Sequence, residues 1–147
     1  MEGISISYIN ILSPKYRQVW DLREEVLRKP LGMSLKNEDL SWDNEDIIFI
    51  AEQNEKVVGC LMLHDVGNKT IKLRQMAVYY SWQGMGIGRM LVGAAEKYAA
   101  QSGYDQVVLH ARKGATGFYT TLGYLQFGDE FMEVGIPHIA MKKDILP

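Results

Sequence analysis

Apolar and polar residues follow two periodicities along the first part of the chain. The opening stretch ISISYIN alternates at period two, which predicts a half-buried strand. Ser13 and Pro14 then give a helix-start signal, with serine as the N-cap and proline at the first helical position. We expect a helix over about residues 14–28, with one apolar stripe and one face in water. The stripe comprises Tyr16, Val19, Trp20, Val26 and Leu27, and the polar face comprises Arg17, Arg23, Glu24 and Arg28.

Three segments with strand character follow, after a polar stretch in which we expect a short helical turn near residues 36–40. They read DIIFIAEQ, KVVGCLMLHDV and TIKLRQMAV, and they are rich in β-branched and other apolar residues. The connections QNEK and GNK contain the asparagine and glycine that tight hairpin turns prefer. This part of the chain is therefore predicted to form an antiparallel meander.

Helical periodicity returns between Gly86 and about Ala100, and Gly103 ends it. DQVVLHA predicts a further strand, GATGFYTTLGY a short helix, and YLQFG and HIAMKK two last strands. This order of elements predicts an α/β or α+β fold, in which helices lie on the faces of a mixed sheet. Because the chain has 147 residues and neither a linker nor a repeat, we expect a single domain over residues 1–147.

Composition narrows the classes of partner. The 16 basic and 18 acidic residues give a net charge of −2 without a basic stripe, so neither nucleic acid nor a membrane is an expected partner. No apolar run approaches the roughly 18 residues of a membrane span, and the first residues lack the pattern of an export signal. The single cysteine, Cys60, lies in the run VVGCLML and is expected to be buried. These features predict a cytoplasmic protein, and no set of metal ligands stands out.

A glycine-rich stretch, SWQGMGIGRML, lies between a predicted strand and a predicted helix. Backbone N–H groups at a helix start have no intrahelical partner and lie at the positive end of the helix dipole, so they bind anions. Gly84, Gly86 and Gly88 would let a phosphate approach the main chain closely. The stretch is not a P-loop, because Arg89 and Met90 follow the last glycine, and it lacks the third glycine of a dinucleotide fingerprint.

Residues 83–88, QGMGIG, resemble the Q/R-x-x-G-x-G/A pyrophosphate loop of the GNAT superfamily of acetyl-CoA-dependent N-acetyltransferases. The matching positions are Gln83, Gly86 and Gly88. The strand LRQMAV, the helix after the loop, the strand VVLHA and the phrase GFYTTLGY follow in the order of that family, so the resemblance covers about residues 45–143. The chain is similar to small bacterial-type members.

The resemblance implies that acetyl-CoA is the acetyl donor and that main-chain groups hold it. Loop amides would bind the pyrophosphate, and the strand before the loop would pair with the pantetheine arm as an added strand. The LRQMAV and QVVLHA strands would be parallel neighbours that splay apart in a mostly antiparallel sheet, and the acetyl-CoA cleft would lie between them. The implied cofactor residues are Met76, Ala77, Val78, Gln83, Gly84, Met85, Gly86, Ile87, Gly88 and Arg89.

Tyr119 in GFYTTLGY matches the tyrosine that similar enzymes place near the cofactor sulfur. A phenol can donate a proton to the departing thiolate, so the resemblance implies a general acid at this position. The main-chain N–H of Val78 would polarise the thioester carbonyl. Helical spacing alone supports another interpretation, in which Ala115, Phe118, Tyr119 and Leu122 are all core residues.

The general base is open among three residues. An alkylamine arrives protonated, and His110, Glu133 and His138 could accept its proton. We favour His110 as the catalytic base because it ends the strand that lines the proposed cleft. His138 is expected to be a core histidine satisfied by hydrogen bonds, and His64, near a hairpin, is expected at the surface.

The acceptor is expected to be a primary amine of a small molecule or of a protein. An acidic cluster could attract such a cation, or it could belong to a solvated loop. Aromatic residues beside the glycine-rich stretch could line the acceptor site or pack the turn. A rival function is a non-catalytic acyl-CoA-binding sensor, and self-association as a homodimer is a further alternative. The acidic cluster comprises Asp39, Asp43, Glu45 and Asp46, and the aromatic residues are Tyr79, Tyr80 and Trp82.

Overall fold

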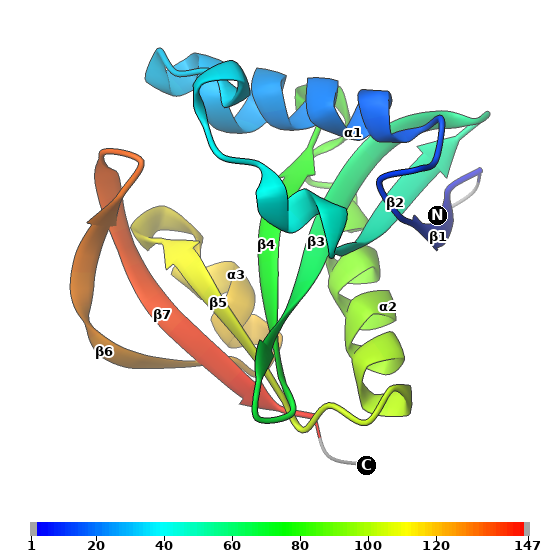
Figure 1. Cartoon of the computed structure of the whole chain (residues 1–147). Coiled ribbons are helices and arrows are strands. Elements are labelled where there is room, and N and C mark those ends of the chain that lie inside the picture. The colour runs from blue at the N-terminus through cyan, green and yellow to red at the C-terminus, as the bar shows by residue number, and fades with distance from the viewer. Residues whose placement is uncertain (1–2, 146–147) are drawn as a thin grey trace. The chain divides into compact units, whose positions relative to one another are not determined.

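A mixed sheet of seven strands forms the frame of the computed structural model, which describes residues 3–145 (Figure 1). Hydrogen bonds join the strands in the order β1-β2-β3-β4-β5-β7-β6. The β4–β5 pair is parallel, and the pairs β1–β2, β2–β3, β5–β7 and β6–β7 are antiparallel. The predicted mixed α/β fold with a mostly antiparallel sheet is confirmed. The elements are β1 (Ser5–Ile9), α1 (Tyr16–Arg23), β2 (Ile47–Gln53), β3 (Lys56–Gly67), β4 (Thr70–Val78), α2 (Ile87–Gln101), β5 (Gln106–Arg112), α3 (Thr116–Thr121), β6 (Leu125–Glu133) and β7 (Ile136–Asp144).

The chain divides into two compact units. Unit 1 comprises the residues up to His64 together with Arg74–Ala95, and unit 2 comprises Asp65–Leu73 together with the residues from Glu96 onward. The long strands β3 and β4 contribute to both units, as does helix α2.

Unit 1 is built on the antiparallel strands β1, β2 and β3. Asn54 and Glu55 connect β2 to β3 with φ angles of 50° and 65°, which is the left-handed geometry that suits a two-residue hairpin turn. Val19 and Leu22 of α1 are fully buried and pack against residues of β2, β3 and β4. The members of this core are Val19, Leu22, Ile48, Ile50, Val57, Cys60, Met62 and Ala77.

The second helix of unit 1 covers the opposite face of these strands. A side chain at Gly59 would meet the methyl groups of Ile87 and Leu91 at 3.0 and 3.1 Å, so α2 lies directly against this position. Its neighbour Cys60 belongs to the core beneath α1, and consecutive strand residues point to opposite faces. Helices therefore lie on both faces of the unit 1 sheet (Figure 1). Cys60 is fully buried, as predicted.

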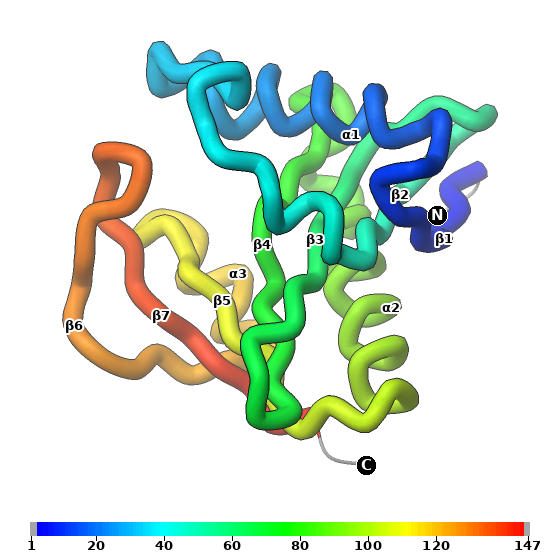
Figure 2. Tube along the Cα trace, viewed as in Figure 1, coloured from blue at the N-terminus to red at the C-terminus, as the bar shows by residue number. Residues whose placement is uncertain are grey.

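The sequence prediction for the first helix is partly wrong. The α-helix begins at Tyr16, because the Ser13 hydroxyl caps an earlier turn by accepting a hydrogen bond from the Lys15 amide at 3.1 Å. Beyond Arg23 the chain continues as a π-helical turn over Glu24–Arg28. The trace remains coiled past the end of α1 (Figure 2). Arg23 is fully buried and Arg28 is 5 % exposed, although both were expected in water. Carboxylate partners distant in sequence explain this difference, since Asp43 pairs with Arg23 and Glu38 pairs with Arg28.

Unit 2 contains the three last strands and the parallel pairing. Thr70–Leu73 of β4 pair with Gln106–Leu109 of β5, and β7 lies antiparallel between β5 and β6. Strand β6 is longer than the predicted segment YLQFG, because it continues through a bulge to Glu133. Gly128 lies in this bulge with a φ of 74°, a conformation that favours glycine. Within the described residues, no helix is long and apolar enough to cross a membrane.

Candidate functional site

The glycine-rich loop lies in unit 1 and connects the end of β4 to the start of α2. A short helical turn over Tyr80–Trp82 leads into the loop, and α2 begins at Ile87. Gly84 and Gly86 have φ angles of 78° and 84°. A Cβ atom at either glycine would meet no atom within 4 Å. These two positions therefore require glycine for their backbone conformation, and the space beside them is open to a ligand.

The start of α2 offers a group of backbone donors. The amides of Ile87, Gly88 and Arg89 belong to the first helical turn, where N–H groups have no intrahelical partner. The Ile87 side chain is 1 % exposed and fixes this turn to the core of unit 1, whereas Arg89 is exposed. The helix dipole adds positive potential at the same place, so this end of α2 can bind an anion such as a diphosphate.

The loop is attached to the end of β4. The Gln83 side chain donates a hydrogen bond from Nε2 to the Val78 carbonyl at 2.8 Å. The Tyr79 amide donates to the Val58 carbonyl at 3.0 Å. The structure therefore brings the predicted cofactor residues of the strand and of the loop together in unit 1.

Strand β4 is irregular just before the predicted pantetheine residues Met76, Ala77 and Val78. Gln75 has a φ of 54°, which is left-handed and uncommon for a residue with a side chain within a strand. Its carbonyl accepts a hydrogen bond from the Cys60 thiol at 3.5 Å. Ala77 points into the core, while Met76 and Val78 are half-buried.

The aromatic residues beside the loop do not share one environment. Tyr79 packs against the core of unit 1, and this burial raises the pKa of its hydroxyl. Tyr80 is 58 % exposed. The interpretation that these residues pack the turn is therefore correct for Tyr79, whereas Tyr80 is available to a ligand.

Tyr119 and Tyr124, both in unit 2, are buried tyrosines with different surroundings. The Tyr124 hydroxyl donates a hydrogen bond to Glu96 at 2.8 Å. Tyr119 is 8 % exposed and makes ring contacts with Phe118 and Tyr124, and its hydroxyl donates to none of the residues that the structure describes. Burial raises the pKa of Tyr119 to about 12. Because none of the described residues engages its hydroxyl, this phenol is the better candidate for a group that acts on a ligand. Phe118 is 37 % exposed, so the helix face is not uniformly core.

The three candidate bases form one cluster in unit 2. His110 Nδ1 lies 2.9 Å from Glu133 Oε1, and His138 Nε2 lies 3.8 Å from Glu133 Oε2. Phe131 contacts the His110 ring edge-on, with 4.8 Å between ring centroids. His138 is 4 % exposed, and its Nδ1 lies 3.0 Å from the Ile136 carbonyl, which confirms the prediction of a hydrogen-bonded core histidine.

The His110–Glu133 contact determines which ring nitrogen of His110 is available. Lys72 Nζ also lies near Nδ1, but at 3.4 Å, so the carboxylate is the closer partner. A carboxylate only accepts hydrogen bonds, so Nδ1 must carry the proton in the 2.9 Å contact. The other nitrogen, Nε2, is then the basic one.

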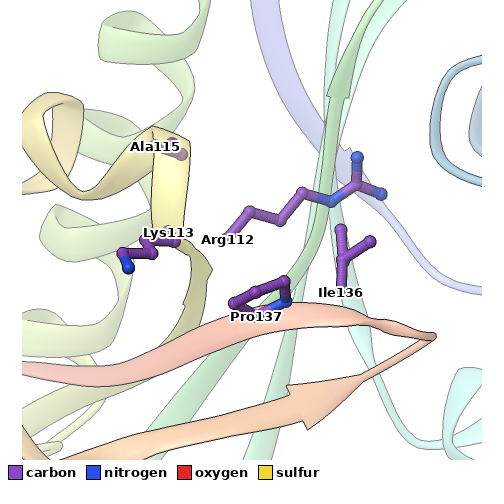
Figure 3. Close-up of a pocket in the computed structure, with 6 residues that line it drawn as sticks. Arg112, Lys113, Ala115, Ile136 and Pro137 are labelled. Carbon is purple, nitrogen blue, oxygen red and sulfur yellow. The ribbon is translucent and has the colours of Figure 1, made fainter.

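A pocket of about 370 Å³ lies where β5 leads into α3, also in unit 2. Arg112, Lys113, Gly114 and Ala115 line it from β5 and the turn that follows, and Ile136 and Pro137 line it from β7 (Figure 3). The Arg112 side chain extends past Ile136, whereas Lys113 points the other way and pairs with Glu130 at 3.2 Å. Apolar groups therefore form most of the lining. Arg112 follows His110 by two positions, so both side chains lie on the same face of β5.

Two of the four residues of the acidic cluster, Asp43 and Asp46, are not available to attract an amine, whereas Asp39 and Glu45 are exposed. Asp43 is fully buried and Asp46 is 2 % exposed, so a solvated loop is also the wrong description for these two residues. Arg74 bonds both carboxylates, and Asp46 also bonds His64 at 2.6 Å. His64 is 7 % exposed and stacks on Trp42, so its predicted surface position is wrong. The cause is again pairing between residues distant in sequence.

Sequence analysis missed two groups that matter for the geometry. Arg23 of α1 donates a hydrogen bond to Gln75 of β4. A helix pattern assigns Arg23 to solvent, and a strand pattern gives Gln75 no special role. Their pairing follows only from the packing of α1 on β4. Within residues 3–145, no group of three or more histidine, cysteine, aspartate or glutamate side chains is placed to hold a metal ion.

Comparison with known proteins adds independent findings. The model of the acetyltransferase (GNAT) domain matches residues 22–145. The uncharacterized N-acetyltransferase YjcF of Bacillus subtilis is 33 % identical over 127 residues, which is 84 % of this chain and 88 % of YjcF. An N-acetyltransferase structure from Lactobacillus plantarum has a TM-score of 0.88 at 24 % identity, covering 99 % of this chain and 100 % of that one. An aminoglycoside 6'-N-acetyltransferase complexed with coenzyme A has a TM-score of 0.82 at 21 % identity, covering 97 % and 98 %.

Proposed function

Because the chain belongs to the GNAT family of acetyltransferases and uses acetyl-CoA as its donor, we propose that it acetylates a primary amine of a small molecule or of a protein in the cytoplasm. The observation that carries this proposal is the loop at the start of α2, with left-handed glycines and open space beside the backbone. A non-catalytic acyl-CoA-binding sensor is the alternative function, and such a module would have no need of a proton donor such as Tyr119. The cytoplasmic assignment is supported by the free, buried Cys60.

The two units act as one N-acetyltransferase domain in this proposal. The family match over residues 22–145 includes parts of both units, which supports a single function for them. Loop amides from Gly84 to Arg89 would bind the diphosphate, and the backbone of Met76, Ala77 and Val78 would pair with the pantetheine arm. The catalytic groups would be Tyr119 and His110, both of unit 2.

The reaction requires one bond to form and one to break. The neutral amine nitrogen attacks the thioester carbonyl carbon, while the Val78 N–H stabilises the negative charge on the oxygen. The C–S bond then breaks while the attacking nitrogen loses one proton to solvent, and Tyr119 donates its own proton to the departing sulfur and is reprotonated by solvent. A phenol with a pKa of about 12 is a weak acid, so this proton transfers only as the C–S bond breaks.

His110 is the proposed general base, and Glu133 is its positioning residue. In the bond to Glu133, Nδ1 carries the proton and leaves the lone pair of Nε2 to accept a proton from the ammonium of the acceptor. Glu133 keeps the hydrogen bond from Nδ1 while Nε2 carries this proton. His138 and Phe131 fill the space around this pair.

Release of free thiol from acetyl-CoA with a panel of amines tests the proposed function. We expect saturable turnover with at least one primary amine and none with a tertiary amine of similar size, because the latter has no proton to lose after attack. The panel should include small alkylamines and peptides with a free lysine. Saturable binding of acetyl-CoA without turnover of any amine would contradict the proposal and favour a sensor.

The same assay tests the base. We expect His110→Gln to lower kcat by about 100-fold, within the usual range for loss of a general base. Glu133→Gln should lower kcat by about 10-fold, because the His110 ring loses the residue that orients it. Nitrogen chemical shifts of the His110 ring should show Nδ1–H in the wild-type protein and a mixture of tautomers in Glu133→Gln. Lys97→Gln, an exposed change on α2, serves as the control. Wild-type turnover in the His110 variant would exclude this residue as the base.

The pocket at the end of β5 is the proposed entry for the acceptor. Its apolar lining and its place on the same strand as His110 support this assignment. A pocket of about 370 Å³ accommodates a group of the size of an amino acid side chain. The acceptor amine would then be carried on an aliphatic stem that lies between Ile136 and the start of α3.

We also propose that the chain pairs with a second copy through β6. This strand ends the sheet order, and it carries Leu125 and Met132 with 70 % and 65 % of their surface exposed. An exposed edge strand with apolar side chains favours association with another strand. Phe127 of the same strand is 41 % exposed. Sedimentation velocity should show a dimer at micromolar concentration and a monomer for Phe127→Lys. A wild-type monomer at all concentrations would contradict the proposal.

A further inference from the structure

A fully buried arginine of α1 contacts β4 at Gln75, the residue just before the proposed cofactor residues. Arg23 Nε donates a hydrogen bond to the side-chain oxygen Oε1 of Gln75 at 3.2 Å, and Nη1 donates to Asp43 at 2.7 Å. The third nitrogen, Nη2, is buried and has no partner among the described residues. All three residues belong to unit 1.

Asp43 fixes the position of this arginine. Burial opposes ionisation of Asp43, but hydrogen bonds from Tyr16 and Arg23 outweigh it, so the pKa of the carboxyl is lowered. Arg74 lies 3.4 Å from the other oxygen of Asp43. The guanidinium of Arg23 is therefore fixed on one side by an ionised carboxylate, and it presents Nε to Gln75.

Gln75 is the residue at which β4 departs from regular strand geometry. Its left-handed backbone, with a φ of 54°, costs free energy for any residue other than glycine and must be maintained by its surroundings. Two contacts hold it: the bond from Arg23 to its side chain and the bond from the Cys60 thiol to its carbonyl. The next three residues are Met76, Ala77 and Val78.

We infer that Arg23 and Gln75 are positioning residues, which maintain the irregularity in β4 and thereby orient the backbone of Met76–Val78 for the pantetheine arm of acetyl-CoA. This inference rests on the proposed placement of the cofactor along that strand. The hydrogen bond between Arg23 and Gln75 would then link α1 to β4.

The energetics of Arg23 favour this role over a purely stabilising one. A buried ion pair is weak evidence for stability, because the cost of desolvating both charges offsets much of their attraction. Proteins in which apolar residues replace such a pair are often equally stable. The buried, unpartnered Nη2 adds a further cost. A role in orienting the strand explains why an arginine with its Nε donor, rather than an apolar residue, occupies this position.

The single cysteine provides a reporter for the contact. The Cys60 thiol is fully buried, and burial raises its pKa to about 12, so it should react slowly with a disulfide reagent at neutral pH. Because this thiol donates to the Gln75 carbonyl, release of Gln75 should expose it. The measurement uses the free protein and requires neither acetyl-CoA nor an amine.

Two variants remove the contact from opposite sides. Arg23→Lys keeps a cation beside Asp43 but lacks the Nε donor, and Gln75→Met keeps the length of the side chain but lacks the acceptor. Arg17→Lys is the matched control, because Arg17 lies on the same helix and 73 % of its side chain is exposed. Near-UV circular dichroism establishes that each variant is folded, and either folded variant is sufficient for the test.

In both variants we expect the thiol reaction and the Kd for acetyl-CoA to rise about 10-fold, which corresponds to the loss of one strong hydrogen bond. The kcat at saturating acetyl-CoA should stay within about 2-fold of wild type, and Arg17→Lys should match wild type throughout. Unchanged thiol reactivity would overturn the contact, and faster reaction with unchanged Kd would overturn its role in positioning the cofactor. Failure of the proposed amine acetylation would be visible separately, as absence of turnover by the wild-type enzyme.

Discussion

Replacing Gly86 with valine should abolish acetyl-CoA binding at concentrations that saturate the wild-type protein, with a loss of affinity of about 100-fold or more. Gly86 has a φ of 84°, a conformation that β-branched residues rarely adopt, so the valine forces the loop to change shape. A direct clash is not the reason, because no atom lies within 4 Å of a Cβ at this position. The loss arises from misdirected amides and from a side chain in the path of the diphosphate. Calorimetric titration with acetyl-CoA measures it.

Gly93→Val provides the control for this substitution. Gly93 lies within α2 and has no left-handed φ, and a Cβ atom added there would likewise meet no atom within 4 Å. The same change there should leave acetyl-CoA affinity within about 2-fold of wild type, because helix interiors tolerate valine at least as well as glycine. If the folded Gly86→Val protein binds acetyl-CoA as wild type does, the loop does not hold the cofactor.

Replacing Tyr119 with phenylalanine should lower kcat by about 100-fold while leaving the Kd for acetyl-CoA almost unchanged. The hydroxyl has no hydrogen-bond partner among the described residues, so its removal should cost the fold little. Its proposed contribution is confined to the step in which the C–S bond breaks. Steady-state kinetics with the best amine of the panel, together with titration of acetyl-CoA, separate the two effects.

Tyr124→Phe is the matched control, since it removes a hydroxyl from a neighbouring buried tyrosine. The Tyr124 hydroxyl bonds Glu96, so this variant should lose about 1 kcal/mol of unfolding free energy but retain turnover. The opposite pattern, with Tyr119→Phe destabilised and fully active, would place Tyr119 among the structural residues.

The pH dependence of the rate gives a second expectation for Tyr119. Burial raises the pKa of this phenol to about 12, and the proposed acid must be protonated to act. The protonated form therefore persists through neutral pH and is lost only as the pH approaches about 12. Up to about pH 10, ionisation of Tyr119 should not lower kcat. A fall in the kcat of the wild-type protein below about pH 10 that is absent from Tyr119→Phe would contradict this expectation.

Local patterns predicted the elements of this fold well, because each depends on neighbours in sequence. The turn residues Asn54 and Glu55 and the apolar repeat of α2 act within a few positions. Arg23 shows where this reasoning ends. Its helical position is polar by pattern, yet it is fully buried because Asp43, 20 residues later, supplies the opposite charge.

The candidate site was predictable to a similar extent. The glycines before α2 predicted a loop at a helix start, and the structure has left-handed glycines at positions 84 and 86 directly before α2. The three base candidates could be named by chemistry, but the contact between His110 and Glu133 depends on the pairing of β5, β7 and β6. His64 and Asp46 were misassigned for the same reason, since their bond joins residues 18 positions apart.

A crystal structure of the protein with acetyl-CoA tests the central claim most directly. We predict that the diphosphate oxygens lie within hydrogen-bonding distance of the backbone amides between Gly84 and Arg89, with the pantetheine arm alongside Met76–Val78. A diphosphate bound elsewhere, with those amides in contact only with solvent, would contradict the account.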